Sequence, residues 1–264
     1  MSKLKRLKEI MNRYNSAIVA YSGGVDSSFL LFCAKRYIKG NVFAVTGISE
    51  TYTREELLFA REFTRQLGLR LITIRTSEFE NPDFIENSER RCYYCKRELF
   101  SKIEKLRKRL GCEVIFDGSN YSDTSDYRPG NLAKKELNVI SPLEIAGFTK
   151  DEIRRYSNKF GIKGYNRPSN ACLASRIPYY TEIDRMTLRK IYAIERFIKS
   201  LGVKTVRVRH HKEIARIETS AEEMDTILEN RERIIREAKR HNYAFVSLDL
   251  EGYRTGSLNR MKNL

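Results

Sequence analysis

Two cysteines lie three positions apart in the stretch ERRCYYCKRE, residues 89–98. This pair, Cys92 and Cys95, provides two thiolates, whereas a tetrahedral zinc ion or a cubane iron–sulfur cluster needs three or four protein ligands. If the pair binds a metal, a third ligand must come from elsewhere in the chain. The alternatives are a disulfide and a chance pairing.

The other three cysteines differ in their surroundings. Cys33 lies in an apolar helical stretch and Cys112 begins an apolar strand, positions where a free cysteine is usually a small buried hydrophobe. Cys172 lies in the loop RPSNACLASRIPYY, flanked by Arg167 and Arg176. Guanidinium groups favour the thiolate, the form that attacks a substrate or binds a metal. Cys172 is therefore the candidate third ligand, and a disulfide or zinc site without it is the alternative.

The stretch AYSGGVDSS predicts an anion-binding loop. A strand ends here, Ser22, Gly23 and Gly24 form a tight turn, and Asp26 and Ser27 open a helix whose free N–H groups face that turn. No lysine follows the glycines, so the stretch is not a Walker motif. The alternative is an ordinary strand–turn–helix junction in which Asp26 caps the helix.

Composition and charge limit the class of protein. The 264 residues are 41% hydrophobic, and no stretch approaches the roughly 18 apolar residues of a membrane span. The basic amphipathic start, MSKLKRLKEIMNRY, lacks the apolar core of a signal peptide, so we expect a cytoplasmic protein without a membrane partner. The net charge of +16 is spread over the whole chain and includes no basic tail, which argues against nucleic-acid binding.

Apolar strands alternate with helical patterns in the first part of the chain, which indicates parallel βαβ units. We expect strands at 16–22, 41–47, 69–76 and 112–120, and helices at 26–38, 53–68 and 96–111. The pattern then changes to a long helix, an alternating stretch at 203–219, a helix at 221–242 and a final strand. The prediction is an α/β domain with a doubly wound parallel sheet over 1–180 and a small α+β domain over 181–264.

The string SGGxDS resembles the pyrophosphate loop of PP-loop ATP pyrophosphatases, whose fold is HUP-like and which split ATP into AMP and pyrophosphate. Six ordered stretches resemble the LarE family over nearly the whole chain: SGGVDSS, RCYYCK, DGSNYSDTSDYRPG, ACLASRIPY, VRVRHH and GYRTGSLN. That family consists of ATP-dependent sulfur transferases of nickel-pincer nucleotide biosynthesis. The resemblance implies adenylation of a carboxylate of pyridinium-3,5-biscarboxylic acid mononucleotide, followed by replacement of its oxygen with sulfur.

The family has two sulfur chemistries. In one branch, the cysteine of the ACLASR motif gives up its own sulfur and becomes dehydroalanine. In the other branch, this cysteine and the CxxC pair hold a 4Fe-4S cluster that carries an extra sulfide. Because this chain has Cys92, Cys95 and Cys172, the resemblance implies the cluster branch, with Cys172 also counted as catalytic.

The resemblance assigns roles to further residues. Lys96 matches a lysine near the nucleotide phosphates, and Asp123 matches an acidic position of the active site, whose role Asp117 or Asp126 could share. Glu195 and Glu218 resemble metal-binding carboxylates of the small domain.

Three other residues have side chains suited to the phosphates that the resemblance implies. Arg207 and Arg209 alternate on one face of a strand, where such a pair can bind the substrate's single phosphate. The alternative is a strand face that is simply exposed to solvent. The Asp26 carboxylate is expected to help hold the Mg²⁺ that neutralises the pyrophosphate leaving group of ATP.

Two alternative functions remain open at this point. One is a tRNA thiolase of the same superfamily, although such enzymes usually carry zinc-ribbon or other RNA-binding modules and no further CxxC pair occurs here. The other is a nucleotide-binding regulator of the universal-stress type, for which the SGGxDS loop and three thiolates would be superfluous. The expected partners are the nucleotide substrate, sulfide or another sulfur donor, and further copies of the chain in a hexamer, the last by resemblance alone.

Overall fold

The computed structural model describes residues 1–125, 129–167 and 171–254. The chain divides into two compact units, the first comprising Met1–Phe84 and Glu89–Asn170 and the second Ile85–Ser88 and Ala171–Leu264. The main part of the second unit thus begins before residue 180, and this unit includes Asn87, whose side chain donates hydrogen bonds to the carbonyls of Pro178 and Thr181. No helix among the described residues is both long and apolar enough to cross a membrane.

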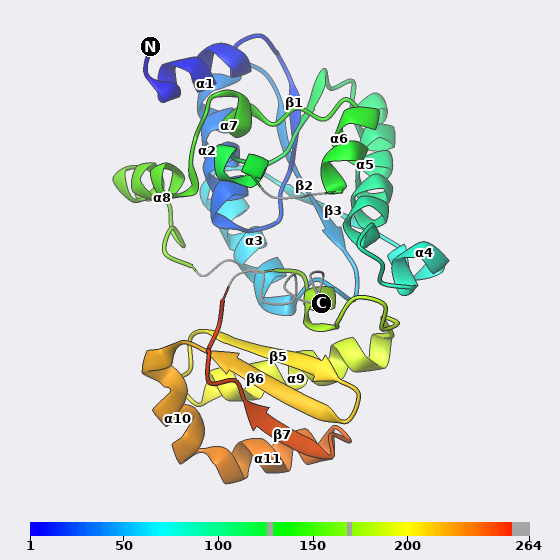
Figure 1. Ribbon diagram of the computed structural model, residues 1–264. Helices are drawn as coiled ribbons and strands as arrows, with labels where there is room; N and C mark the ends of the chain where they lie inside the picture. Colours follow the sequence, from blue (N-terminus) through cyan, green and yellow to red (C-terminus); the bar gives the residue numbers. More distant parts are fainter. Residues whose placement is uncertain (126–128, 168–170, 255–264) are drawn as a thin grey trace. The chain divides into compact units, whose positions relative to one another are not determined.

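The first unit contains a four-stranded parallel sheet (Figure 1). Its strands are β1 (Ala17–Ala20), β2 (Val42–Ile48), β3 (Leu71–Arg75) and β4 (Val114–Phe116), in the order β3-β2-β1-β4. Parallel neighbours require crossover connections, which are made here by α2 (Val25–Tyr37), α3 (Arg54–Gln66) and α5 (Arg91–Leu110). The chain runs from β1 to β2 in one direction and returns to β4 on the other side of β1, so the strand order reverses between β1 and β4.

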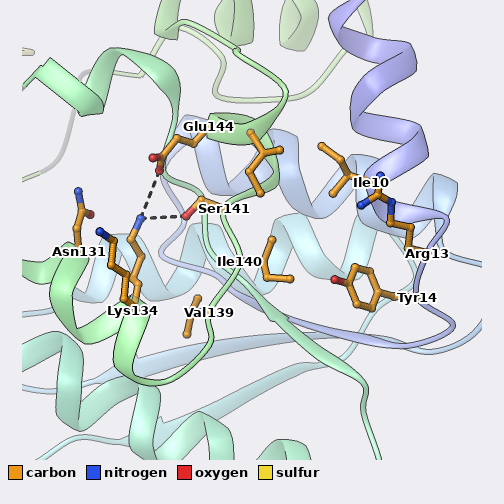
Figure 2. Close-up of a pocket in the computed structure, with 11 residues that line it drawn as sticks. Ile10, Arg13, Tyr14, Asn131, Lys134, Val139, Ile140, Ser141 and Glu144 are labelled. Atoms are coloured by element: carbon orange, nitrogen blue, oxygen red, sulfur yellow. Dashed lines mark hydrogen bonds and ion pairs between the residues drawn. The ribbon is translucent and has the colours of Figure 1, made fainter.

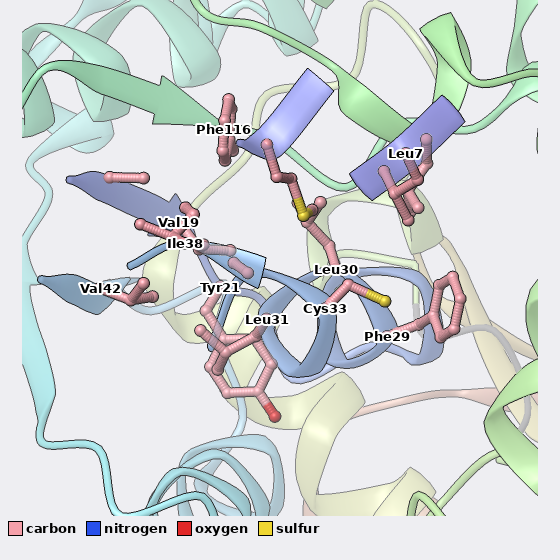
Figure 3. Close-up of a cluster of buried hydrophobic side chains, with 14 of the residues drawn as sticks. Leu7, Val19, Tyr21, Phe29, Leu30, Leu31, Cys33, Ile38, Val42 and Phe116 are labelled. Atoms are coloured by element: carbon pink, nitrogen blue, oxygen red, sulfur yellow. The ribbon is translucent and has the colours of Figure 1, made fainter. Parts of the chain in front are cut away.

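Helices cover both faces of this sheet because its strands are apolar on both sides. Val19 of β1 packs in one cluster with Phe29 and Leu30 of α2 (Figure 3). The neighbouring residue Ile18 points to the opposite face and packs with Ile103 of α5. The predicted doubly wound α/β fold is thus confirmed.

Shorter elements complete the first unit. They are α1 (Lys3–Met11), η1 (Glu78–Glu80), α4 (Pro82–Ile85), η2 (Tyr121–Ser125), α6 (Gly130–Glu136), α7 (Pro142–Ile145) and α8 (Lys150–Lys159), where η denotes a 3-10 helix and α4 ends in the second unit.

The second unit is the small α+β fold that the sequence predicts. Its strands β5 (Val206–His211), β6 (Ile214–Thr219) and β7 (Phe245–Leu248) form one sheet in which β5 and β6 are antiparallel and β6 and β7 parallel. Its helices are η3 (Leu173–Arg176), α9 (Arg185–Ser200), η4 (Ala221–Glu223), α10 (Met224–Glu229) and α11 (Arg231–Arg240). The single helix expected over 221–242 is wrong, since Asn230 leaves the helical conformation and separates α10 from α11.

Candidate functional site

The loop between β1 and α2 has the geometry of an anion cradle. Gly23 has a φ of 77°, a left-handed conformation that glycine adopts without strain, and Gly24 is the N-cap of α2 without a side-chain capping bond. The helix therefore begins with backbone N–H groups that no side chain of the cap satisfies. Asp26 lies inside the first turn, so the alternative in which Asp26 caps the helix is wrong.

Hydroxyl groups hold this loop in shape. Ser27 Oγ donates to the carbonyl of Gly24 at 3.1 Å and lies 3.1 Å from Ser22 Oγ, which accepts from the Gly24 N–H at 3.3 Å. Tyr52 donates its hydroxyl proton to the Ser22 carbonyl at 3.0 Å. The loop is thus fixed before any ligand binds, which lowers the entropy lost on binding.

A second loop meets this one where the strand order reverses. β4 ends at Phe116, and the segment Asp117–Asn120 follows it. A Cβ placed on Gly118 would lie 3.0 Å from both the N and the Cα of Ser27, so the two backbones touch. In open parallel sheets, ligands bind beyond the carboxyl ends of the strands at this reversal point. The SGGVDSS loop lies at this reversal point, and its role in ligand binding stays a prediction.

Asn120 joins the two acidic residues of this site. Its side-chain amide donates to Asp26 Oδ2 at 3.2 Å, and its backbone N–H donates to Asp123 Oδ2 at 3.1 Å. The second oxygen of Asp26, Oδ1, is buried and has no hydrogen-bond partner among the described residues. Burial raises the pKa of Asp26; the positive charge of Lys150 opposes this shift, and the negative charge of Asp123 adds to it. Asp126 lies outside the described residues.

The CxxC pair lies on the first turns of α5, which begins at Arg91 rather than near Lys96 as expected. Cys92 and Cys95 share a helix face because they are three residues apart. Cys92 is exposed, and Cys95 is partly buried with its Sγ 3.8 Å from Glu78 Oε1. The Lys96 side chain packs against the start of α6, since a Cβ on Gly130 would lie 2.5 Å from Lys96 Cδ.

In the second unit, Arg176 positions the backbone around Cys172. Cys172 is exposed and precedes η3. The buried guanidinium of Arg176 donates to the carbonyls of Ala171 at 2.6 Å and Cys172 at 3.1 Å, and to both oxygens of Glu195 at 2.9 and 3.2 Å. Burial opposes the charge on Arg176, but the charge of Glu195 and the hydrogen bonds to its carboxylate outweigh this effect and raise the pKa of the guanidinium.

The two predicted phosphate-binding arginines are buried rather than displayed on an exposed strand face. Arg209 donates to the carbonyl of Ser175 at 2.8 Å and to Glu218 Oε2 at 2.7 Å. Arg207 donates to the carbonyl of Val206 at 2.8 Å, and its guanidinium carbon lies 5.0 Å from the centre of the Tyr253 ring. Burial lowers the pKa of Arg207, and the positive charge of Arg176 lowers it further.

The predicted metal ligands have other hydrogen-bonding roles in the structure. Glu195 Oε1 also accepts from the backbone N–H of Val208 at 3.0 Å, and Glu218 Oε1 accepts from Arg216 at 3.1 Å. These ion pairs, which the sequence analysis missed, account for the burial of both carboxylates. Within the parts of the chain that the structure describes, no group of three His, Cys, Asp or Glu side chains is arranged to hold a metal.

The three candidate cluster cysteines belong to different units. Cys92 and Cys95 are in the first unit and Cys172 is in the second. A site formed by all three thiols, and a metal role for Glu195 and Glu218, therefore stay predictions.

Comparison with known proteins gives relatives that match nearly the whole chain and others that match part of it. An uncharacterised protein of Synechocystis sp. is 35% identical over 262 residues, which cover 98% of this chain and 98% of that protein. Pyridinium-3,5-bisthiocarboxylic acid mononucleotide synthase of Lactiplantibacillus plantarum is 33% identical over 243 residues, 91% of this chain and 88% of that enzyme. A tRNA sulfurtransferase of Desulfurococcus amylolyticus is 25% identical over 191 residues, 66% of this chain and 39% of that protein. No protein-family model matches the chain.

Proposed function

Because the chain belongs to the LarE family of ATP-dependent sulfur transferases, we propose that it acts on pyridinium-3,5-biscarboxylic acid mononucleotide. One carboxylate oxygen attacks the α-phosphate of ATP, giving an acyl adenylate and pyrophosphate. A sulfur nucleophile then adds to the acyl carbon and AMP leaves, which produces the thiocarboxylate. The similarity to the tRNA sulfurtransferase covers less of the chain at lower identity, so tRNA thiolation has weaker support.

The observation that carries this proposal is the pairing of two acidic residues beside the anion cradle. Asp26 Oδ1 is buried without a hydrogen-bond partner among the described residues, and the nearby charge of Asp123 helps to raise the Asp26 pKa. Two carboxylates at such a site fit a hard divalent cation, which prefers oxygen ligands. We assign Asp26 and Asp123 as Mg²⁺ ligands and the SGGVDSS loop as the binding site of the ATP phosphates. When bound, Mg²⁺ neutralises charge on the pyrophosphate leaving group.

Lys96 is proposed to contact the nucleotide phosphates. It follows Cys95 on α5 and is partly buried against Gly130. An ammonium group is a compact point charge suited to phosphate oxygens. This role rests on the family resemblance and on the type of residue.

The thiols of Cys92, Cys95 and Cys172 are proposed to hold a 4Fe-4S cluster. Three thiolates are a suitable donor set for three irons of a cubane, and the exposure of Cys92 and Cys172 leaves their sulfurs accessible. When bound, the cluster carries the sulfur that replaces the substrate oxygen. Arg176 contributes by fixing the backbone on either side of the Ala171–Cys172 peptide. The sulfur donor and a hexameric assembly are parts of this proposal that rest on resemblance alone.

The buried arginines of the second unit are proposed to bind the substrate phosphate. Arg176, Arg207 and Arg209 are all buried, and the pKa of Arg207 is lowered by burial and by the charge of Arg176. Guanidinium groups bind phosphate through two parallel hydrogen bonds, and the negative charge of a phosphate would offset the repulsion between neighbouring arginines. Glu195 and Glu218 would then orient these arginines, as an alternative to binding metal directly.

Arg207→Met is expected to raise the dissociation constant of the mononucleotide by roughly tenfold to a hundredfold, the range for loss of a hydrogen bond to a charged group. The affinity for ATP should stay unchanged, because the SGGVDSS loop lies in the other unit of the chain. Calorimetric titration with each ligand measures both constants. Arg189→Met, which removes an exposed arginine from α9, is the matched control. Equal loss of both affinities would show damaged packing instead.

The function itself is tested by anaerobic turnover. Protein reconstituted with iron and sulfide is incubated with the mononucleotide, Mg²⁺-ATP and sulfide, and the products are analysed by mass spectrometry. We expect one AMP and one pyrophosphate for each oxygen replaced by sulfur. Sulfur incorporated into tRNA, with the mononucleotide unchanged, would overturn the proposal in favour of a tRNA thiolase.

A further inference from the structure

A buried ammonium group lies close to the loop that carries Asn120. Lys134 of α6 is 5% exposed, and its Nζ donates to Ser119 Oγ and Ser141 Oγ, both at 2.9 Å. Its Nζ also lies 3.5 Å from Asp117 Oδ1 and 3.6 Å from Glu144 Oε2. Figure 2 shows the contacts of Lys134 with Ser141 and Glu144. Burying a charge is costly unless it is paired and hydrogen-bonded, and these four partners meet both conditions.

The hydrogen bonds of this network have one direction. Ser119 Oγ donates to Asp117 Oδ2 at 2.8 Å, and Ser141 Oγ donates to Asp117 Oδ1 at 2.5 Å. An ammonium group can only donate and an ionised carboxylate can only accept, so each hydroxyl must accept from Lys134 and donate to Asp117. The network therefore fixes Asp117 and Ser119 in one arrangement.

The fixed residues are neighbours of the ATP site in the chain and in space. Gly118, between Asp117 and Ser119, touches the backbone of Ser27, and the next residue, Asn120, donates to Asp26. Four consecutive residues thus connect Lys134 to the carboxylate assigned to Mg²⁺. Replacing Lys134 would therefore first shift the side chains of Ser119 and Asp117, and then the position of Asn120.

We propose that Lys134 is a positioning residue that sets the place of Asn120, and through it of Asp26, for binding Mg²⁺-ATP. This inference rests on the Mg²⁺ role of Asp26 in the proposed function. Lys134 acts through Ser119 and Asp117 and need not touch the nucleotide. Mutation of residues that orient metal ligands typically weakens metal binding or activity by about 10- to 100-fold.

The first test is Lys134→Met, a side chain of similar length without the charge. Lys134 also lines a cavity of about 540 Å³, so the substituted side chain has room to adjust. We expect the dissociation constant of ATP in the presence of Mg²⁺ to rise by about 10- to 100-fold. The dissociation constant of ATP in EDTA should stay close to that of the wild type, because without Mg²⁺ the position of the Asp26 carboxylate contributes no metal contact to nucleotide binding. A purely structural role would weaken both to the same degree.

The matched control is Lys135→Met in the same helix, where the lysine is exposed. It removes the same charge without touching the network and should keep the wild-type affinity with and without Mg²⁺. If Lys135→Met weakened Mg²⁺-ATP binding as much as Lys134→Met, general electrostatics would explain the effect and the inference would be wrong.

A double variant separates positioning from folding. Lys134→Met leaves Asp117 as a buried carboxylate without its ammonium partner, which destabilises a fold. Lys134→Met combined with Asp117→Asn removes both charges, so thermal stability should return toward the wild-type value while Mg²⁺-ATP binding stays weak. Recovery of Mg²⁺-ATP affinity together with stability would overturn the positioning role.

These measurements are made without the mononucleotide, so they are independent of sulfur transfer. A wild-type protein that binds Mg²⁺-ATP but leaves the mononucleotide unchanged would contradict the proposed substrate and leave the role of Lys134 intact. A wild-type protein whose ATP affinity does not depend on Mg²⁺ would overturn the metal role of Asp26 and this inference with it.

Discussion

Asp26→Asn is expected to lower Mg²⁺-dependent ATP–pyrophosphate exchange by at least about 100-fold, the scale on which a removed electrostatic group reduces catalysis. The amide keeps the shape of the side chain and can still accept the hydrogen bond from Asn120, so the loop should stay folded. It lacks the charge that would hold Mg²⁺ beside the pyrophosphate. Exchange is measured with the mononucleotide present, and an undiminished rate would remove Asp26 from the mechanism.

The same substitution is expected to stabilise the ligand-free protein at neutral pH. Burial raises the pKa of Asp26 in the folded state, so its contribution to stability is present below the unfolded-state pKa of about 3.9 and is lost as the pH rises through the folded-state value. At pH 7 the ionised carboxylate therefore costs stability that the neutral amide does not. The melting temperature of Asp26→Asn should exceed that of the wild type at pH 7, and the difference should shrink toward pH 4.

Asp83→Asn, at an exposed position of α4, is the control for removal of a negative charge and should change neither exchange nor the pH dependence of melting. A melting temperature of Asp26→Asn below that of the wild type at pH 7 would mean that the carboxylate is stabilised in the ligand-free fold. Because Mg²⁺ would relieve the cost of Asp26 ionisation, the ion should raise the melting temperature of the wild type more than that of the variant.

The fold could be predicted wherever the signal was local. Buried parallel strands are continuous apolar runs, and the strands expected at 16–22 and 41–47 contain β1 and most of β2. Two helix ends were wrong because they carry weak local signals. Arg90 precedes α5 without a side-chain capping bond, and the helical pattern continues past Asn230, where the chain leaves the helix.

The site residues, too, could be predicted only where they are close together in the sequence. The SGGVDSS loop could be located because its strand, glycines and helix are contiguous in the chain. Asn120 was missed because its partner Asp26 lies 94 positions away, and no local pattern links them. The sequence shows many charged residues but not which of them become buried, so the ion pairs Arg176–Glu195 and Arg209–Glu218 could be recognised only in the folded unit.

Replacing any one of Cys92, Cys95 and Cys172 with alanine is expected to lower iron content and abolish sulfur transfer, since two thiolates hold a cubane cluster poorly. Cys112→Ala is the control, because this thiol is buried and burial raises its pKa, which disfavours the thiolate that a metal needs. Iron and acid-labile sulfide are determined on anaerobically purified protein. A variant of Cys92 or Cys95 with wild-type iron content would exclude that residue from the cluster.

The sacrificial mechanism makes the opposite prediction for the same variants. If Cys172 gives up its own sulfur, Cys92→Ala keeps up to one turnover, and mass spectrometry of the spent protein shows the loss of one H₂S from the Cys172 peptide. The cluster mechanism instead requires several turnovers with added sulfide and an unchanged Cys172, together with inactivation in air because an iron without a protein ligand is open to oxygen. A single turnover by iron-replete, anaerobic protein, with dehydroalanine at position 172, would therefore assign the sulfur to the cysteine itself and leave the adenylation step at Asp26 unaffected.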